Sequence, residues 1–182
     1  AAKGFHLLPA LVRSVLEKTE DVHFAIQCPK SASGDDYSAL PAGVGELREI
    51  EKAAGKDRLT LVSERLGEAD YANMFRSLDV VLIPYVLPGY IEPTSGIFAE
   101  AVALGKPTVV TEQTWMAHEL KKFGGGGLEI KSDDARDLEE KVFQLIAHYA
   151  DFSAKARDYA PVWCEFHNSR RLAEMLLGEI GK

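Results

Sequence analysis

Hydrophobic and polar positions along the chain follow two alternating periodicities. Short apolar runs rich in β-branched residues predict strands at 21–28, 59–62, 80–83, 108–110 and 128–130. Apolar residues at helical spacing predict helices at 5–16, 44–54, 68–78, 96–104, 115–122, from 133 onward and over 152–180. Strands that alternate with helices form parallel sheets with helical crossovers. The predicted fold class is therefore α/β, a Rossmann-like parallel sheet flanked by helices.

The segment Asp79–Thr111 organises the rest of the chain. It reads as a strand, a loop rich in proline and glycine, a helix and a second strand. Thr94 or Ser95 can cap the helix, Gly105 follows its end, and Pro107 prevents its continuation. One face of this helix is apolar and is expected to pack on the sheet: Ile97, Phe98, Ala101 and Val102.

Two glutamates flank the start of this helix. Glu92 precedes it and Glu100 lies within it, with seven residues between them. Ser95, Gly96 and Ile97 form the helix N-terminus, whose N–H groups attract an anion, and Gly96 allows close approach. Two carboxylates repel a phosphate unless hydroxyl donors occupy their oxygens. A nucleoside-diphosphate sugar meets both needs, because a hydroxyl-bearing ring lies at each end of its diphosphate.

The block E-P-T-S-G-I-F-A-E-A-V-A-L-G-K-P-T-V-V resembles the E-x7-E block of the group 1 retaining GT-B glycosyltransferases. The resemblance implies that the chain is the C-terminal, donor-binding half of a GT-B fold. It implies that Glu92, the expected catalytic residue, meets the donor sugar and that Glu100 meets the ribose. The backbone at Ser95, Gly96 and Ile97 would bind the diphosphate.

The resemblance extends over nearly the whole chain. Lys3-Gly4 before F-H-L-L-P-A-L is similar to the family's Lys-Gly position, which implies that Lys3 contacts the diphosphate. The segment around Leu66 resembles the strand and loop whose backbone recognises the nucleobase. Three places depart from the family pattern: Cys28-Pro29-Lys30 and Ser63, where glycine is usual, and Thr94-Ser95-Gly96, where the family has Phe-Gly.

The implied activity is transfer of a sugar, hexosyltransferase-like, from a UDP- or GDP-sugar to an acceptor hydroxyl in bacterial glycan or polysaccharide biosynthesis. No cofactor and no metal are expected, since the helix N-terminus and Lys3 would stabilise the leaving diphosphate. Residues 1–182 would form one donor-binding domain, with 151–182 as its helical tail. Its first strand and the acceptor-binding N-terminal domain are expected upstream of residue 1, so this chain alone should bind nucleotide without turnover.

Two other functions are compatible with the pattern. The first is a non-catalytic nucleotide-binding or regulatory α/β module, although a receiver-like domain needs an acidic residue at a strand end and Asp79 precedes its strand. The second is a degenerate glycosyltransferase domain kept as a structural partner. The intact pair Glu92 and Glu100 argues against such decay.

Composition narrows the class of protein. The chain is 46% hydrophobic and 27% charged, which is ordinary for a globular domain, and its net charge of -7 argues against general nucleic-acid binding. No apolar run approaches the ~20 residues of a membrane span. We expect a cytoplasmic protein, peripheral at the inner face of the membrane in its full length. Cys28 and Cys164 are expected to be buried thiols.

Several remaining signals have structural explanations. The run Gly124–Gly127 follows a helix and precedes a strand, so it predicts a helix C-cap and turn rather than a phosphate loop. Asp35-Asp36 has no accompanying ligand cluster and predicts a solvated loop. Trp115 and Glu119 either line the cleft or serve as a packing aromatic and a capping or solvated carboxylate.

Helix ends in the second half carry two further predictions. Ser132 is expected to cap the helix that begins at Asp133. Pro161 is expected to break the final helical segment. The apolar stripe of the penultimate helix is predicted to consist of Leu138, Val142, Leu145, Ile146 and Tyr149.

Overall fold

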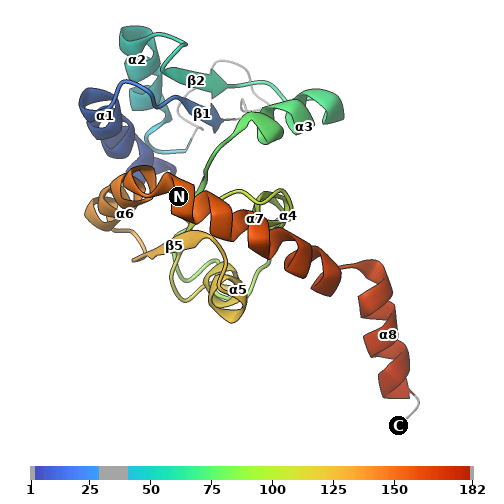
Figure 1. Cartoon of the computed structure of the whole chain (residues 1–182). Helices are drawn as coiled ribbons and strands as arrows, with labels where there is room; N and C mark the ends of the chain where they lie inside the picture. Colours follow the sequence, from blue (N-terminus) through green and yellow to red (C-terminus); the bar gives the residue numbers. More distant parts are fainter. Residues whose placement is uncertain (1–2, 29–40, 181–182) are drawn as a thin grey trace.

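The computed structural model describes residues 3–28 and 41–180 (Figure 1). Its elements, in order, are η1 (Phe5–Leu7), α1 (Leu8–Lys18), β1 (Phe24–Gln27), α2 (Val44–Ala54), β2 (Leu59–Val62), α3 (Glu68–Ser77), β3 (Val81–Ile83), α4 (Gly96–Ala103), β4 (Thr108–Thr111), α5 (Trp115–Phe123), β5 (Gly127–Ile130), α6 (Ala135–Ala147), α7 (Tyr149–Phe166) and α8 (Ser169–Ile180). The predicted order of elements is confirmed. Most of the predicted loop 29–42, including Asp35-Asp36, lies outside the described residues.

The described strands form two parallel sheets. β1 pairs with β2, and β3, β4 and β5 pair in that order. Leu59 lies opposite Phe24 in the first sheet, while Thr108 lies between Val81 and Gly127 in the second. Parallel pairing requires crossovers, which the intervening helices supply. In Figure 1, β1 and β2 lie together with α1 and α2, while β5 and α5 lie across α6 and α7 from them.

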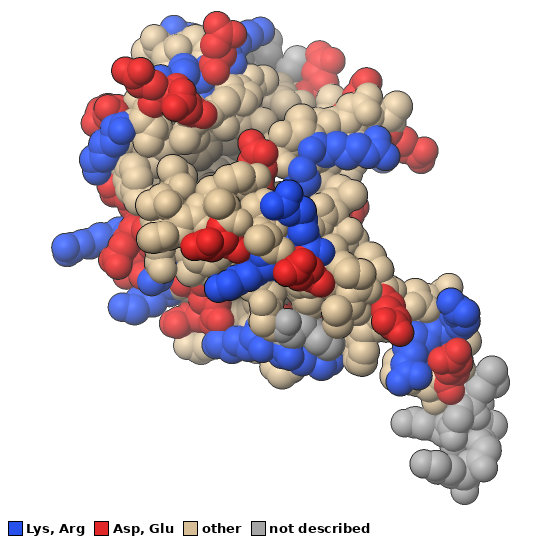
Figure 2. Space-filling view, in the orientation of Figure 1, with Lys and Arg blue, Asp and Glu red and all other residues tan. Residues whose placement is uncertain are grey.

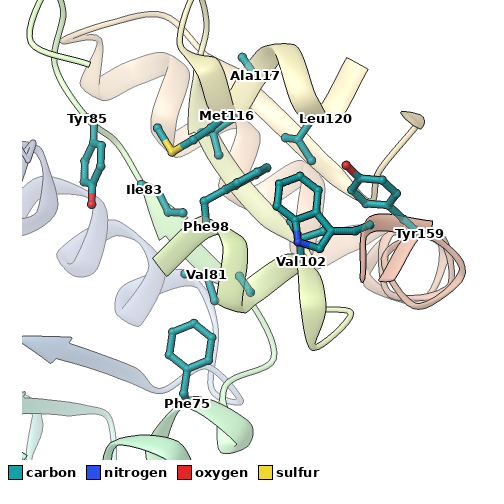
Figure 3. Close-up of a cluster of buried hydrophobic side chains, with 13 residues drawn as sticks. Phe75, Val81, Ile83, Tyr85, Phe98, Val102, Met116, Ala117, Leu120 and Tyr159 are labelled. Carbon is teal, nitrogen blue, oxygen red and sulfur yellow. The ribbon is translucent and has the colours of Figure 1, made fainter. Parts of the chain in front are cut away.

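Helix α4 is anchored by an aromatic core. Phe98 is fully buried, and its ring meets the edges of Trp115 and Trp163 with centroids 5.6 Å away in each case. Figure 3 shows Phe98 among side chains from β3, α4, α5 and α7, with Phe75 of α3 at the border of the same cluster. The predicted inward face of α4 is confirmed, with Ile97 packed at its edge. Helix α4, which follows Glu92 and carries Glu100, is therefore held firmly on the sheet.

The predicted cap of α6 is wrong. Asp134 is the N-cap, and its Oδ1 accepts hydrogen bonds from the N–H groups of Arg136 (3.0 Å) and Asp137 (2.9 Å). Asp133 takes a φ of 60°, which turns the chain before the helix begins. The Ser132 hydroxyl instead accepts a hydrogen bond from the Leu87 N–H at 2.9 Å. Ser132 thus ties the end of β5 to the loop that follows β3.

The predicted break at Pro161 is also wrong. Helix α7 continues through Pro161 because Tyr159 and Trp163, on either side of it, are buried in the core around α4. The break comes at Asn168, whose side-chain amide donates to the carbonyl groups of Cys164 and Glu165. Its Oδ1 accepts a hydrogen bond from the Arg171 N–H, in the first turn of α8, at 2.9 Å. Beyond this point α8 extends away from the body of the molecule (Figure 1).

Two predicted buried side chains are exposed. Cys28 is buried as expected, and burial raises the pKa of its thiol, but Cys164 lies on the outer face of α7. Tyr149 begins α7 instead of completing the stripe of α6, and its hydroxyl donates to Asp79 Oδ1 at 3.3 Å. Helix α6 ends before Tyr149, so the helical period that grouped it with Leu145 does not continue.

Charged side chains cover the molecule in a mixed pattern. Figure 2 shows basic and acidic side chains interspersed over the face that it draws. Ion pairs such as Lys52 with Glu49, at 2.7 Å, are exposed and contribute little to stability. Within the described ranges, no helix is both long and apolar enough to cross a membrane.

Candidate functional site

The N-terminus of α4 is open toward solvent. Ser95 is the N-cap, and its hydroxyl accepts a hydrogen bond from the Phe98 N–H at 3.3 Å, which decides between the two predicted caps. The N–H groups of Gly96 and Ile97 belong to the first turn, where the helix itself supplies no acceptor. A Cβ at Gly96 would meet no heavy atom within 4 Å. The backbone here can therefore approach a bound anion closely.

Glu92 lies on the anchored loop that leads into α4. The Tyr85 carbonyl accepts the Thr111 hydroxyl at 2.5 Å, and the Ile91 carbonyl accepts the Trp115 N–H at 3.0 Å. These bonds fasten the loop to β4 and to the start of α5. Glu92 itself is exposed. It borders a hollow of about 520 Å³ whose other lining residues are Ile91, Gln113, Thr114, Trp115, Ala117, His118 and Lys121.

Glu100 is exposed but already has a partner in the protein. Its Oε2 accepts a hydrogen bond from the Tyr71 hydroxyl of α3 at 2.6 Å. Burial and this bond with Glu100 raise the pKa of Tyr71 to about 12. Helical periodicity predicts Tyr71 as an inward apolar position of α3, and nothing in the sequence links it to Glu100. The pairing depends on how α3 packs beside α4.

The turn at Lys3 lies at the carboxyl edge of the second sheet, beside the end of β3. Gly4 is buried with a φ of 71°, and a Cβ there would lie 2.0 Å from the Pro84 carbonyl oxygen. Only glycine allows this contact, so the Lys3-Gly4 backbone lies directly against the residue that follows β3. Lys3 is exposed there. The structure thus brings Lys3 to the start of the loop that carries Glu92.

Leu66 occupies the corresponding loop of the first sheet. It is half-buried, follows β2, and lies two residues before α3, the helix that supplies Tyr71. Lys3 and the N-terminus of α4 lie at the carboxyl edge of the second sheet, and Leu66 lies at the carboxyl edge of the first sheet. Ligands of parallel α/β folds bind at such edges. The predicted residues therefore share this kind of position.

Helix α5, which lines the hollow beside Glu92, carries a buried carboxylate. Glu119 is 4% exposed, and its Oε2 lies 3.0 Å from Nε2 of His167. The His167 ring stacks on Trp163 with centroids 3.8 Å apart, and Trp115 packs edge-on against both rings. Glu119 is therefore neither a solvated nor a capping carboxylate, and it joins α5 to the end of α7. Trp115 both packs in the core and lines the hollow beside Glu92.

Within residues 3–28 and 41–180, no three histidine, cysteine, aspartate or glutamate side chains come together in a way that could hold a metal ion. The glycine run has the structural role that was predicted for it. Gly124 is the C-cap of α5 with a φ of 65°, and the following glycines lead into β5.

Comparison with known proteins identifies the family. Residues 2–148 match the family described as glycosyl transferases group 1, so the chain belongs to this family. No curated protein matches the sequence.

Solved structures show the same fold. HepE from Anabaena, in complex with UDP, is 21% identical with a TM-score of 0.69, covering 97% of this chain and 46% of its own. Sucrose-phosphate synthase from Thermosynechococcus elongatus is 16% identical with a TM-score of 0.67, covering 98% and 41%. The C-terminal domain of the group 1 family protein LpcC from Francisella tularensis is 17% identical with a TM-score of 0.68, covering 91% and 80%. The chain spans about half the length of HepE. These likenesses confirm the predicted Rossmann-like fold class of the GT-B glycosyltransferases.

Proposed function

We propose that the chain is the donor-binding half of a retaining glycosyltransferase that transfers a sugar from a UDP- or GDP-sugar to an acceptor hydroxyl. The observation that carries this proposal is the open N-terminus of α4, flanked by Glu92 before it and Glu100 within it. The family membership supports the reaction class. Solved structures of HepE with UDP and with UDP-glucose support a uridine nucleotide as the first donor to test.

The diphosphate would lie against the N–H groups of Gly96 and Ile97. As the bond between sugar and phosphate breaks, negative charge grows on the departing diphosphate. The positive end of α4 and the Lys3 ammonium group would stabilise that charge without a metal ion. Preorganised donors of this kind lower the barrier because they need no rearrangement during the reaction.

The two glutamates would act through position. Glu92 would accept hydrogen bonds from the sugar hydroxyls and orient the anomeric carbon toward the acceptor, which is the catalytic role that we assign to it. Glu100 would accept hydrogen bonds from the ribose hydroxyls; it lies roughly 6 Å along the helix axis from Gly96. The Leu66 backbone would contact the nucleobase. Each carboxylate would thus meet hydroxyl donors, while the phosphates between them meet only N–H groups and a cation.

The sheets suggest where the rest of the protein connects. β1 pairs with β2 along one side, and β3 pairs with β4 along one side. On the other side of β1 and on the other side of β3, no described strand is paired. Helix α1 packs against both α2 and α6 and so bridges the two sheets. We place a parallel strand upstream of residue 1 at these edges, preceded by an acceptor-binding domain. The likeness to a separate C-terminal domain of LpcC supports this division.

The proposal has one consequence for the isolated chain and one for the full-length protein. The isolated chain should bind donor nucleotide without transferring sugar, because the acceptor site lies in the other domain. For the full-length protein we propose a role in bacterial glycan or polysaccharide biosynthesis, in the cytoplasm or at the inner face of the membrane.

Calorimetric titration of the chain with UDP, GDP and ADP tests the proposal. We expect one nucleotide to bind, and Glu100→Ala to weaken its binding by about 1–3 kcal/mol, the scale of a lost hydrogen bond to a charged group. Glu140→Ala, at an exposed position of α6, is the matched control and should leave the affinity unchanged. If none of the three nucleotides binds the wild-type chain, the proposal is refuted.

A further inference from the structure

The contact between Tyr71 and Glu100 joins two helices at the candidate nucleotide site. The Tyr71 hydroxyl donates to Oε2 of Glu100 at 2.6 Å, while the carboxylate remains exposed to solvent. The Tyr71 ring is half-buried and packs beside Phe75, with centroids 5.7 Å apart. Phe75 belongs to the buried core around α4. The phenol therefore projects from a fixed support toward a side chain that would otherwise rotate freely.

An exposed glutamate samples many rotamers, and ordering it upon binding costs conformational entropy. A hydrogen bond from a rigid aromatic side chain removes much of that freedom before the ligand arrives. Because the pKa of Tyr71 is raised to about 12, its hydroxyl stays a donor throughout the neutral range. The Tyr71 hydroxyl is therefore available to orient the Glu100 carboxylate throughout that range.

The bond leaves room for a ligand on the same carboxylate. A carboxylate has about four acceptor positions on its two oxygens, and the Tyr71 hydroxyl uses one of them. Oε1 and the second lone pair of Oε2 remain for the two hydroxyls of a ribose ring. Tyr71 and a ribose diol can therefore bind Glu100 together, so the phenol need not be displaced.

We propose that Tyr71 is a positioning residue of the nucleotide site, which orients the Glu100 carboxylate to accept both ribose hydroxyls and so favours ribonucleotides over their deoxy counterparts. This inference rests on the proposed function, in which Glu100 binds the ribose. Tyr71 does not touch the reacting atoms and acts only through Glu100.

The test compares Tyr71→Phe, Glu100→Ala and the double variant by calorimetry with UDP, 2′-deoxy-UDP and 3′-deoxy-UDP. Tyr71→Phe removes only the hydroxyl and should weaken UDP binding about three- to tenfold, the effect of one hydrogen bond. Its effect on the deoxy nucleotides should be smaller, so that discrimination between UDP and its deoxy forms falls. In the Glu100→Ala background, Tyr71→Phe should have no further effect.

The chain offers a matched control. Tyr149→Phe also removes a phenol that donates to a carboxylate, in this case Asp79, which precedes β3 and lies at the opposite end of that strand from the site. Tyr149→Phe should leave the affinity for UDP and the discrimination unchanged. Circular dichroism of every variant should match that of the wild type.

Each other outcome overturns a defined claim. A Tyr71→Phe effect of equal size on UDP and the deoxy nucleotides, or one that persists without Glu100, would reveal general damage rather than positioning. Tighter binding by Tyr71→Phe would show that the phenol competes with the ribose. If Glu100→Ala weakens nucleotide binding as expected but Tyr71→Phe leaves the affinity unchanged, only this inference is overturned. If Glu100→Ala has no effect on nucleotide binding, or if the wild type binds none of UDP, GDP and ADP, the proposed function is overturned as well.

Discussion

Substitution of Gly96 by alanine separates the folding role of α4 from its role in binding. Gly96 is the first residue of α4, its φ is not positive, and a Cβ there would meet no heavy atom within 4 Å. Replacing glycine by alanine at such a position stabilises the fold by about 0.4–1 kcal/mol, since the unfolded chain loses freedom. For a chain of this length, that gain corresponds to a rise in Tm of roughly 1–4 °C.

The same methyl group should harm binding. It would point into the open space over the helix N-terminus, where the proposed diphosphate approaches the N–H groups of residues 96 and 97. We expect nucleotide affinity to fall at least about tenfold, or roughly 1.4 kcal/mol. A more stable protein that binds more weakly is an outcome that general damage does not produce.

The assay is thermal denaturation together with calorimetric titration of the nucleotide that binds the wild type. Gly45→Ala is the matched control, because Gly45 also lies in the first turn of a helix, has open space at its Cβ and is outside the proposed site. It should shift Tm in the same direction and leave affinity unchanged. Wild-type affinity in a folded Gly96→Ala chain would refute the placement of the diphosphate.

Two further predictions concern the contacts that position the site. Gly4→Ala should destabilise the chain by about 1–3 kcal/mol in denaturant unfolding, because φ is 71° and the new Cβ would lie 2.0 Å from the Pro84 oxygen; unchanged stability would contradict this contact. Since the pKa of Tyr71 is raised from 10.0 in the unfolded chain to about 12, its stabilising contribution should be complete below pH 10 and lost as the pH rises through 12. Burial also raises the pKa of Tyr159, so tyrosinate absorbance should show more than one late-titrating group, and one of them should be absent from Tyr71→Phe.

Local patterns account for the parts of the fold that were predicted correctly. Caps and apolar periodicity involve residues within about one turn of each other, so the bounds of α2 and β2 and the inward face of α4 follow from neighbouring residues alone. Ser95 and Gly96 mark the start of α4 in the same local way. The spacing of Glu92 and Glu100 around that start carried the candidate site.

The wrong predictions at Ser132 and Pro161 share a different cause. Ser132 and Pro161 each have a strong local preference, for a cap and for a helix break, but tertiary contacts outweigh it. The Ser132 hydroxyl accepts a hydrogen bond from the Leu87 N–H instead of capping α6. Tyr159 and Trp163, on either side of Pro161, are buried in the aromatic core. Glu119 was expected either to line the cleft or to be a capping or solvated carboxylate, because its partner, His167, is distant in the sequence.

The sequence by itself determined the family, the order of elements and the helix N-terminus between two glutamates, because each depends on residues close together in the chain. Only the tertiary structure decided which groups surround that N-terminus. The Tyr71 hydroxyl reaches Glu100, and Gly4 lies against Pro84, because separate elements pack side by side. Such contacts depend on sheet order and helix packing, and the side chains that make them carry no local signal of their partners.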